Sequence, residues 1–417
     1  AYDTNFDIIT AGTQDTGALE QTGTGSTTWD SVRLADGGKV AVSDSTPGTS
    51  IRYFSEQNLG LFTRRTCNPG CVDASPSLSG IGASDPQFYT PLATHYDDPA
   101  RLLFGLFGYV GESNDQGDNV SAVPGTGVTA TSDANMVYGH PNDSELIYVG
   151  GAAGVFVRTS DSGQLDPTPT AFPGGRVYGI AVDPVDENVI YVIDDDQVYR
   201  SEDGGTTWIE ITGNIAAEGA GTFRSIAYIE GEPGLGNDKL VVGTNAGVMV
   251  SVEPHFNGWF RLGDDLPNAP VWDLDYDAPD DLLVAGTLGR GVWTLADVSL
   301  VTVPVVTNPG EVRFDPVCVG DTSYAALQVC NTGLADLRVS NILSSDSQFA
   351  VIDPTPPGWP IQISPDFCFE FQVTFTPTSP GEQTATFTVL SNDPVNPEFE
   401  VPAFGTAGEP QMTATLQ

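Results

Sequence analysis

Short runs of apolar and β-branched residues, separated by turns rich in glycine, proline and aspartate, recur along the first 300 residues. The clearest unit has three such runs at 179–183, 189–192 and 197–200 and a fourth that begins at Trp208. Runs of this kind predict β-strands, and four antiparallel strands in about 40 residues make a unit the size of a propeller blade. The sequence contains no long amphipathic helical period, so we predict an all-β protein.

The same order of strands repeats along this part of the chain, in units that begin near residues 3, 38, 93, 136, 179, 225 and 271. A single unit cannot bury both of its faces, so the units are expected to close into a ring. We therefore predict a β-propeller of about seven blades over residues 1–300, with six or eight blades as alternatives. The first unit lacks an inner strand and the last lacks a clear fourth one, and strand sharing between the two ends would repair both defects.

One turn in the repeat has a recognisable motif, Ser201-Glu-Asp203-Gly-Gly205-Thr-Thr-Trp208. Aspartate and glycine suit a tight turn, Ser201 can bond back into it, and Trp208 can anchor the next strand on the core. The motif resembles the Asp-box, or BNR repeat, of sialidases, sortilin-type receptors and other β-propellers. A second copy, Thr159-Ser-Asp161-Ser-Gly163, lacks the tryptophan. In those families the box lies on an outer turn away from the ligand, so the resemblance implies a structural role for these residues.

Beyond a predicted linker at 301–309 the pattern changes to strict alternation. Every second residue is apolar from Phe367 to Phe375, as expected for a strand with one buried face. About seven such strands in roughly 100 residues predict an immunoglobulin-like sandwich over residues 310–408, followed by a tail at 409–417.

Several short segments of this region resemble the Hydin-like, ASH-type immunoglobulin family. They are Cys318-Val-Gly320, Cys330-Asn-Thr-Gly333, Thr374-Phe-Thr-Pro377, Ser391-Asn-Asp-Pro394 and Phe404-Gly-Thr406. The resemblance implies a spacer, stalk or interaction module that carries no catalytic residues.

The composition narrows the choice of partner. The chain has 15 basic and 55 acidic residues and a net charge of −40, so it repels nucleic acid and anionic lipid. Its lack of a continuous apolar stretch of about 20 residues argues against membrane insertion. The spacing Cys67-Asn-Pro-Gly-Cys71 favours a small disulfide loop and an oxidising compartment, so we expect a secreted or cell-surface protein. Among Cys318, Cys330 and Cys368, one pair and one free thiol are expected, and the pairing stays open.

The candidate chemistry lies in acidic residues. Asp273 and Asp275 fall in the inner strand of the last unit, where they could perform glycosidase acid/base chemistry, hold a cation or bond neighbouring blades. Two acidic clusters offer oxygen ligands for calcium, the one cofactor that the sequence suggests, or form plain acidic turns. They consist of Asp194, Asp195 and Asp196, and of Asp115 and Asp118.

The first choice of function is a non-enzymatic extracellular binding or scaffold protein. The propeller face would bind a carbohydrate or an extracellular protein, with the long segments 66–91 and 110–134 as candidate binding loops. The abrupt start at Ala1 is expected of a processed piece of a longer precursor. The alternatives are a glycoside hydrolase of the Asp-box type and a self-assembling subunit of an extracellular fibre or sheath.

Overall fold

The computed structural model describes residues 1–125, 128–130, 135–160, 163–231, 237–253, 256–263, 265–308, 310–354 and 358–409. The chain is all-β and divides into two compact units, Ala1–Leu300 and Val301–Gln417. Within the described residues, no helix has the length and apolar character needed to cross a membrane.

The first unit consists of small antiparallel sheets, each built from strands that follow one another in the chain. In its described part there are seven, of which six have four strands and the last has three. They are formed by β1 (Tyr2–Asp3), β2 (Ile8–Thr13), β3 (Gly17–Gln21) and β4 (Trp29–Arg33); β5 (Ala41–Thr46), β6 (Thr49–Phe54), β7 (Thr63–Asn68) and β8 (Gly70–Ala74); β9 (Leu92–Thr94), β10 (Leu102–Leu106), β11 (Tyr109–Ser113) and β12 (Ser121–Ala122); β13 (Met136–His140), β14 (Asp143–Gly151), β15 (Gly154–Arg158) and β16 (Asp166–Pro167); β17 (Gly179–Val182), β18 (Ile190–Ile193), β19 (Val198–Ser201) and β20 (Ile209–Glu210); β21 (Phe223–Ile229), β22 (Lys239–Thr244), β23 (Gly247–Val252) and β24 (Trp259–Leu262); and β25 (Val271–Asp277), β26 (Leu282–Thr287) and β27 (Gly291–Ala296).

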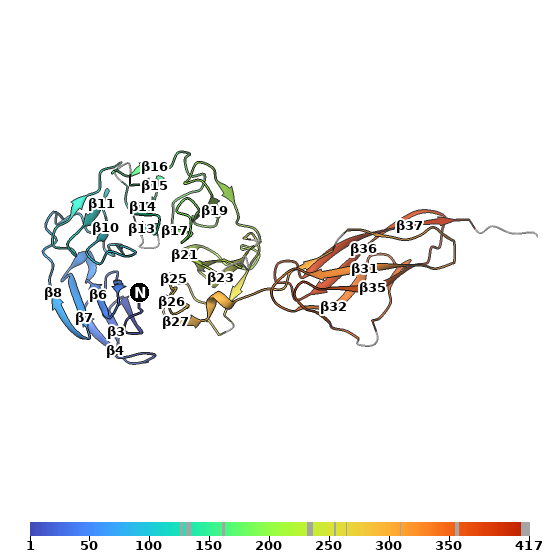
Figure 1. The fold of residues 1–417 in the computed structure, drawn as a ribbon, viewed down its shortest axis with the longest axis horizontal. Coiled ribbons are helices and arrows are strands. Elements are labelled where there is room, and N and C mark those ends of the chain that lie inside the picture. Colours follow the sequence, from blue (N-terminus) through green and yellow to red (C-terminus); the bar gives the residue numbers. More distant parts are fainter. Residues whose placement is uncertain are drawn as a thin grey trace, which may run out of the picture. The chain divides into compact units, whose positions relative to one another are not determined.

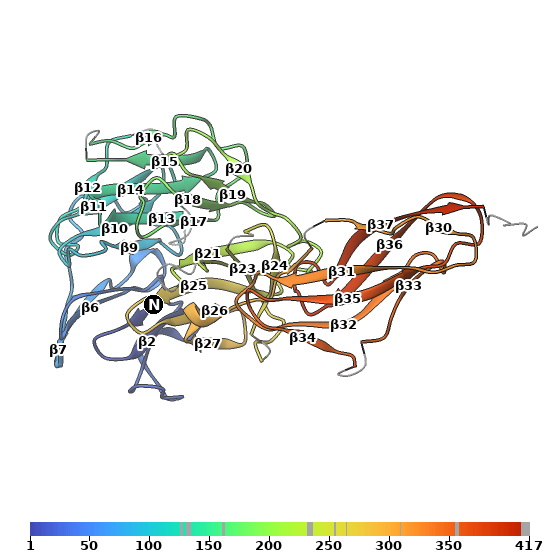
Figure 2. The same cartoon turned by 45° about the vertical axis from the view of Figure 1, so that its right-hand side comes forward.

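The sheets follow one another around a ring, so that the last sheet, β25–β27, lies beside the first (Figures 1 and 2). The short strand β1 is the inner strand that the sequence did not predict. It escaped notice because it has two residues, one of them the charged Asp3. The expected sharing of a strand between the first and last sheets is absent from the described residues.

Alternating turns give the ring two faces. In each sheet the turn between the second and third strands, and the connection to the next sheet, lie on one face, which we call the loop face. The turns between the first and second strands, and in the four-stranded sheets those between the third and fourth, lie on the opposite face.

The hydrophobic core of this unit lies between sheets rather than inside one. Separate buried clusters join the second sheet to the third, the third to the fourth, the fourth to the fifth and the fifth to the sixth. The middle strands β10 and β18 are buried along their whole length because both of their faces are covered. Each sheet therefore depends on its neighbours for stability.

A polar contact also recurs between neighbouring sheets, at the end of the inner strand. His95 donates from Nε2 to the Ser144 carbonyl at 2.7 Å, and His140 donates from Nε2 to the Asp183 carbonyl at 2.8 Å. The other ring nitrogen of each histidine accepts a backbone N–H of its own turn. Each imidazole thus holds its own turn and the next sheet together.

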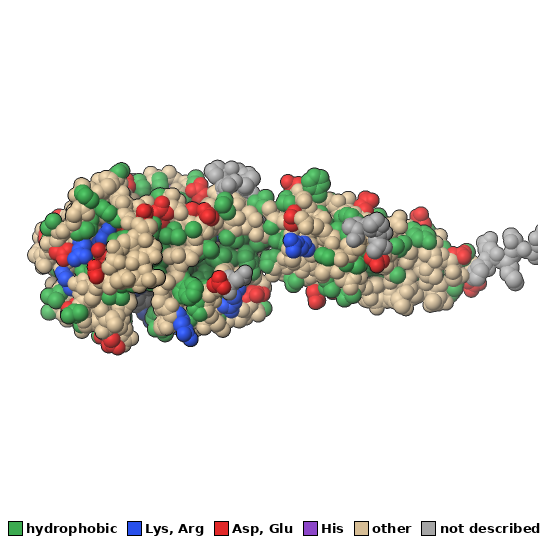
Figure 3. Space-filling view, turned by 90° about the horizontal axis from the view of Figure 1, so that it is seen from below, with side chains coloured by type: hydrophobic (Ala, Val, Ile, Leu, Met, Phe, Trp, Pro, Cys, Tyr) green, Lys and Arg blue, Asp and Glu red, His purple; other side chains and the backbone are tan. Residues whose placement is uncertain are grey.

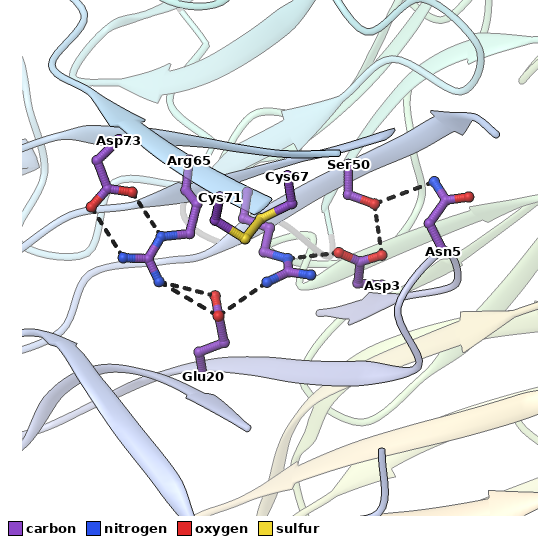
Figure 4. Close-up of a disulfide and its surroundings, with 9 residues drawn as sticks. Asp3, Asn5, Glu20, Ser50, Arg65, Cys67, Cys71 and Asp73 are labelled. Atoms are coloured by element: carbon purple, nitrogen blue, oxygen red, sulfur yellow. Dashed lines mark hydrogen bonds and ion pairs between the residues drawn. A yellow bond between two sulfur atoms is a disulfide. The ribbon is translucent and has the colours of Figure 1, made fainter. Parts of the chain in front are cut away.

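The first two sheets are joined by a buried ionic network (Figure 4). Asp3, which is fully buried, accepts a hydrogen bond from Arg52 Nε at 2.6 Å and one from Ser50 at 2.7 Å. Arg52 also pairs with Glu20 of β3 at 3.0 Å. Because a buried charge is stable only with partners, this network fixes β1 against the second sheet.

The predicted disulfide lies beside this network. Cys67 and Cys71 are direct cross-strand partners in the β7–β8 hairpin and are bonded to each other. In the same hairpin, Arg65 makes a two-point contact with Asp73 at 2.7 and 3.0 Å. The disulfide and the ion pair tie this outer hairpin together.

The second unit consists of two sheets around one core. One sheet has the order β28-β31-β35-β33, and the other has the order β29-β37-β36-β32-β34 with β30 also paired to β37. The strands are β28 (Val306–Thr307), β29 (Val312–Arg313), β30 (Val317–Cys318), β31 (Ser323–Asn331), β32 (Leu337–Ser344), β33 (Phe349–Val351), β34 (Ile361–Ile363), β35 (Cys368–Phe375), β36 (Gly381–Ser391) and β37 (Glu398–Gly408). Alternate residues of β35 and β36, such as Phe371, Val373 and Phe387, fill the core.

The cysteine pairing that the sequence left open is Cys330–Cys368, a cross-strand pair of β31 and β35, and Cys318 is the free thiol. The strand β28 lies within the stretch that the sequence treats as a linker.

The third and fourth sheets share a second ionic cluster, centred on Glu112 of β11. Glu112 contacts Arg158 and Arg101, each at 2.8 Å, and accepts a hydrogen bond from the Tyr138 hydroxyl. Burial alone would raise the pKa of Glu112, but the hydrogen bonds from Arg158, Tyr138 and Arg101 outweigh it and lower the pKa to about 2.

This cluster predicts a specific acid sensitivity. Because the folded pKa of Glu112 lies below the unfolded value, its contribution to stability is complete above about pH 4.5 and is lost as the pH falls towards 2. Glu112→Gln should lower the free energy of unfolding at pH 7 by about 3 kcal/mol and flatten its decline in that window. The measurement is denaturant unfolding from pH 2 to pH 7.

The matched control is Glu145→Gln, which changes a half-exposed carboxylate of the same cluster. It should cost less than about 1 kcal/mol. An acid-unfolding curve of Glu112→Gln that coincides with the wild-type curve would show that the cluster does not govern acid stability.

Candidate functional site

The two carboxylates considered for catalysis lie where the ring closes. Asp275 Oδ2 accepts the backbone N–H of Tyr2 at 2.7 Å, and Asp273 Oδ2 lies 3.7 Å from Lys39 Nζ. The next carboxylate along β25, Asp277, accepts a hydrogen bond from the Thr4 hydroxyl. The contacts of Asp275 and Asp277 connect β25 to the start of the chain, and that of Asp273 connects it to the segment before β5. This corresponds to the blade-bonding alternative considered for these residues.

The turn at Ser201 forms a compact set of hydrogen bonds. Ser201 Oγ accepts the Gly205 N–H at 2.9 Å, and Asp203 Oδ1 accepts the Thr207 N–H at 2.7 Å. Gly205 has φ +86°, and a Cβ there would lie 2.6 Å from Thr168 of the preceding sheet. Glycine is required here both by its conformation and by this close approach.

Trp208 completes the contact with the preceding sheet. Its indole N–H donates to the Thr170 carbonyl at 3.3 Å, and its ring lies edge-on to Phe172 at 5.2 Å. The turn therefore fastens one sheet to the next.

A second turn has the same hydrogen bonds, and sequence reasoning missed it. Ser113 Oγ accepts the Gly117 N–H at 2.8 Å, and Asp115 Oδ1 accepts the Asn119 N–H at 2.8 Å. The contacts with neighbouring segments also correspond, since the Gly117 and Gly205 carbonyls accept N–H groups at 3.1 and 3.0 Å. The signal was the spacing S-x-D-x-G at 113–117, which the missing tryptophan and the surrounding acidic residues concealed.

The remaining calcium candidates also bond within the protein. Asp194 is buried and accepts the N–H groups of Gly175 at 2.7 Å and Gln197 at 2.8 Å, and Asp118 pairs with Arg64 at 3.1 Å. Asp195 and Asp196 lie in the exposed turn that follows Asp194. Among the described residues, no group of three or more histidine, cysteine or acidic side chains is placed to hold a metal ion. Calcium binding stays a prediction.

The weaker motif copy is described in part. Asp161 lies outside the described residues, and Gly163 has a left-handed backbone with φ +65°.

Large apolar side chains gather on the loop face, over the second and third sheets. Leu61, Phe88, Tyr89 and Phe107 are each more than a third exposed, and we call them the apolar patch. Phe88 and Tyr89 pack edge-to-face with ring centroids 4.7 Å apart. They belong to the predicted binding segment 66–91, whereas Leu61 and Phe107 lie in short turns that the sequence did not single out.

Backbone hydrogen bonds connect the loops of the apolar patch. The Asn58 N–H donates to the Phe88 carbonyl at 3.0 Å, and the Phe107 N–H donates to the Asp85 carbonyl at 2.9 Å. Asn58, Leu59 and Leu61 all have positive φ values of 47–57°. Such conformations are costly for residues other than glycine and are concentrated at functional sites.

Two acidic side chains lie near Tyr89 of this patch. Burial, and then the charges of Asp36 and Asp15, raise the pKa of the Tyr89 hydroxyl. A partner with an apolar centre and a basic or neutral edge would match this surface.

A second surface feature is a cleft of about 730 Å³ between the first and last sheets. Its walls include Ile9, Leu19 and Trp29 from the first sheet and Val292 and Trp293 from the last. Figure 3 views the ring from the side on which these two sheets lie in Figure 1, and hydrophobic side chains reach the surface on that side.

Comparison with known proteins identifies part of the chain. Residues 299–399 match the ASH family model, described as abnormal spindle-like microcephaly-associated, ASPM–SPD-2–Hydin. This segment is an ASH domain. The match confirms the resemblance of the second unit and covers about the segment that the sequence assigned to it. A search of curated proteins finds no sequence that matches the chain.

Solved structures resemble the chain in fold. An ASH/PapD-like domain of human CEP192 shows 15% identity and a TM-score of 0.21, with 26% of this chain and 87% of that chain covered. BBS1N, solved in complex with ARL6DN, shows 14% identity and a TM-score of 0.46, with 70% of this chain and 91% of that chain covered. The GH74 enzyme of Niastella koreensis shows 15% identity and a TM-score of 0.43, with 92% of this chain and 61% of that chain covered. At these identities and scores the likenesses carry no information on function.

Because the turns at Ser113 and Ser201 have the same hydrogen bonds, we predict that Asp115 and Asp203 have the same structural role. Hydrogen bonds from Asn119 lower the pKa of Asp115, and those from Thr207 lower the pKa of Asp203. Asp115→Ala and Asp203→Ala should each lower the thermal midpoint by about 2–4 °C, because each removes the acceptor that orders its turn. Differential scanning calorimetry with calcium and with a chelator measures this effect.

Asp30→Ala, at an exposed position of β4 outside both turns, serves as the control and should leave the midpoint nearly unchanged. If calcium raised the midpoint of the wild type but not that of Asp115→Ala, Asp115 would be a metal ligand rather than a turn residue.

Proposed function

We propose that this protein is a non-enzymatic extracellular or cell-surface binding and scaffold protein. Residues 1–300 form a seven-bladed, Asp-box-type β-propeller that carries the binding surface, and the ASH domain forms an immunoglobulin-like sandwich that acts as a spacer. The seven consecutive sheets around a ring support the propeller, and the two sheets around one core support the sandwich. Two disulfides fit an oxidising, extracellular setting.

The observation that carries this proposal is the apolar patch on the loop face. Its four large side chains stay in water although the sheets below them have a filled core. Exposed apolar groups held by an ordered, strained backbone favour recognition of a partner, because the binding conformation costs little to form. The aromatic pair suits either a protein surface or a sugar ring, so the partner is an extracellular protein or a carbohydrate.

The rival functions lack a comparable observation. Asp273 and Asp275, the carboxylates considered for a glycoside hydrolase, have contacts with Lys39 and Tyr2. Self-assembly into a fibre would bring together surfaces of chains that each carry a net charge of −40, which opposes association at low salt.

The test compares a patch variant with a matched surface variant. The double variant Leu61→Asn and Phe107→Ser removes apolar surface, and asparagine tolerates the left-handed backbone at residue 61. The full chain is probed against immobilised glycans and immobilised extracellular protein domains. We expect the double variant to bind the partner about tenfold or more weakly than the wild type.

Val185→Ser is the control, because Val185 is equally exposed but lies in the β17–β18 turn on the opposite face. It should bind like the wild type. A partner that binds the wild type and the double variant equally would place the binding surface outside the apolar patch.

A further inference from the structure

The last sheet of the ring is incomplete. The six preceding sheets each have a fourth, outer strand, but the described residues of the last sheet end with β27 as an unpaired edge. The chain does not return along this edge. After β27 the Val298 N–H bonds to the Asp281 carbonyl, and the Ser299 carbonyl accepts Lys239 Nζ of the sixth sheet at 2.6 Å.

In two other sheets, the main chain just beyond the outer strand provides a carbonyl that accepts a tryptophan N–H of the following sheet. Trp208, immediately before the fourth strand of the fifth sheet, donates its indole N–H to the Thr170 carbonyl at 3.3 Å. Trp259, at the start of the fourth strand of the sixth sheet, donates to the Ile211 carbonyl at 3.2 Å. Both carbonyls belong to main chain just beyond the fourth strand of the preceding sheet.

Trp29 occupies the same position in the first sheet. It starts the fourth strand and faces Gln21 at the end of the third strand, just as Trp259 faces Ser251. The preceding sheet around the ring is β25–β27, which has no fourth strand among the described residues. Within that part of the chain the Trp29 indole N–H has no hydrogen-bond partner, and its ring lines the cleft opposite Trp293.

We propose that the cleft and the β27 edge bind an extended segment of a partner polypeptide, which adds to β27 as a fourth antiparallel strand. Its backbone would pair with the free edge of β27, and one of its carbonyls would accept the Trp29 indole N–H. Alternate side chains of an added strand point to one face, so apolar residues at every second position would enter the cleft. The fourth strands of the other sheets have two to five residues, which indicates the length of the paired segment.

The charges at the two ends of the cleft set a preferred direction. Asp7 precedes β2 and Arg290 precedes β27, and these two strands run in opposite directions, so the two charges lie at opposite ends. A strand antiparallel to β27 has its carboxyl end beside Arg290 and its amino end beside Asp7. The favoured segment is therefore basic at its amino end and acidic at its carboxyl end. A second copy of this chain is disfavoured by the net charge of −40 on each molecule.

A displayed library of random ten-residue peptides selected on the full chain provides the probe. A selected peptide, made synthetically, should slow hydrogen exchange of the backbone amides in 291–296, because strand pairing protects an edge. The same peptide N-methylated at alternate residues keeps its side chains but should lose binding. Trp29→Phe should weaken binding about threefold to tenfold, as expected for loss of one hydrogen bond.

Trp272→Phe is the matched control, since Trp272 is exposed but does not line the cleft, and it should bind like the wild type. The patch variant Leu61→Asn/Phe107→Ser should also bind the peptide normally, which separates this proposal from the proposed function.

The proposal is overturned if no selected peptide protects residues 291–296, or if the N-methylated peptide binds as well as the parent. It is also overturned if soluble oligosaccharides, rather than peptides, protect the cleft, or if the purified chain protects these amides by concentration-dependent self-association.

Discussion

Residues 1–300 depend on one constraint, which is that a small sheet has two apolar faces and can cover them only with its neighbours. Four described interfaces meet this requirement with buried clusters. Since each cluster belongs to two sheets, loss of one sheet exposes the faces of the next. Each sheet is stable only between two neighbours, so the ring is closed only if the first and last sheets also contact each other.

At that junction polar bonds hold the inner strand in place. The inner strand β1 has two residues and buries little, but Tyr2 bonds to Asp275 on one side and Asp3 bonds to Arg52 on the other. Elsewhere the histidines and acidic groups that follow the inner strands add polar links to interfaces that are already filled. Placing Asp3 in a fully buried site costs desolvation energy, which its hydrogen bonds with Arg52 and Ser50 offset. These polar bonds fix the position of β1, which is too short to be held by packing alone.

The sequence predicted the repeating part of the structure well, because strand patterns and turn residues are local signals. The predicted repeat starts lie within three residues of the first strands of the observed sheets, which begin at residues 2, 41, 92, 136, 179, 223 and 271. It missed β1, because that strand has two residues and its contacts with Arg52 and Asp275 join segments more than 40 residues apart along the chain. It missed the Ser113 turn because an acidic cluster also fits a calcium site. It missed Leu61 and Phe107 because exposure depends on tertiary neighbours and not on residue type. The ASH domain was recognisable because its motifs are contiguous.

The apolar patch and the cleft differ in how binding would affect the rest of the ring. The patch lies over sheets whose interface is filled, so a partner bound there adds contacts without changing ring closure. The cleft lies between two sheets that are joined at the inner strand by polar bonds. A ligand that binds both walls of the cleft binds the closed ring and not the open one, so it stabilises closure in proportion to RT ln(1 + [L]/Kd). Because every sheet depends on its neighbours, that stabilisation extends from the junction to the whole ring.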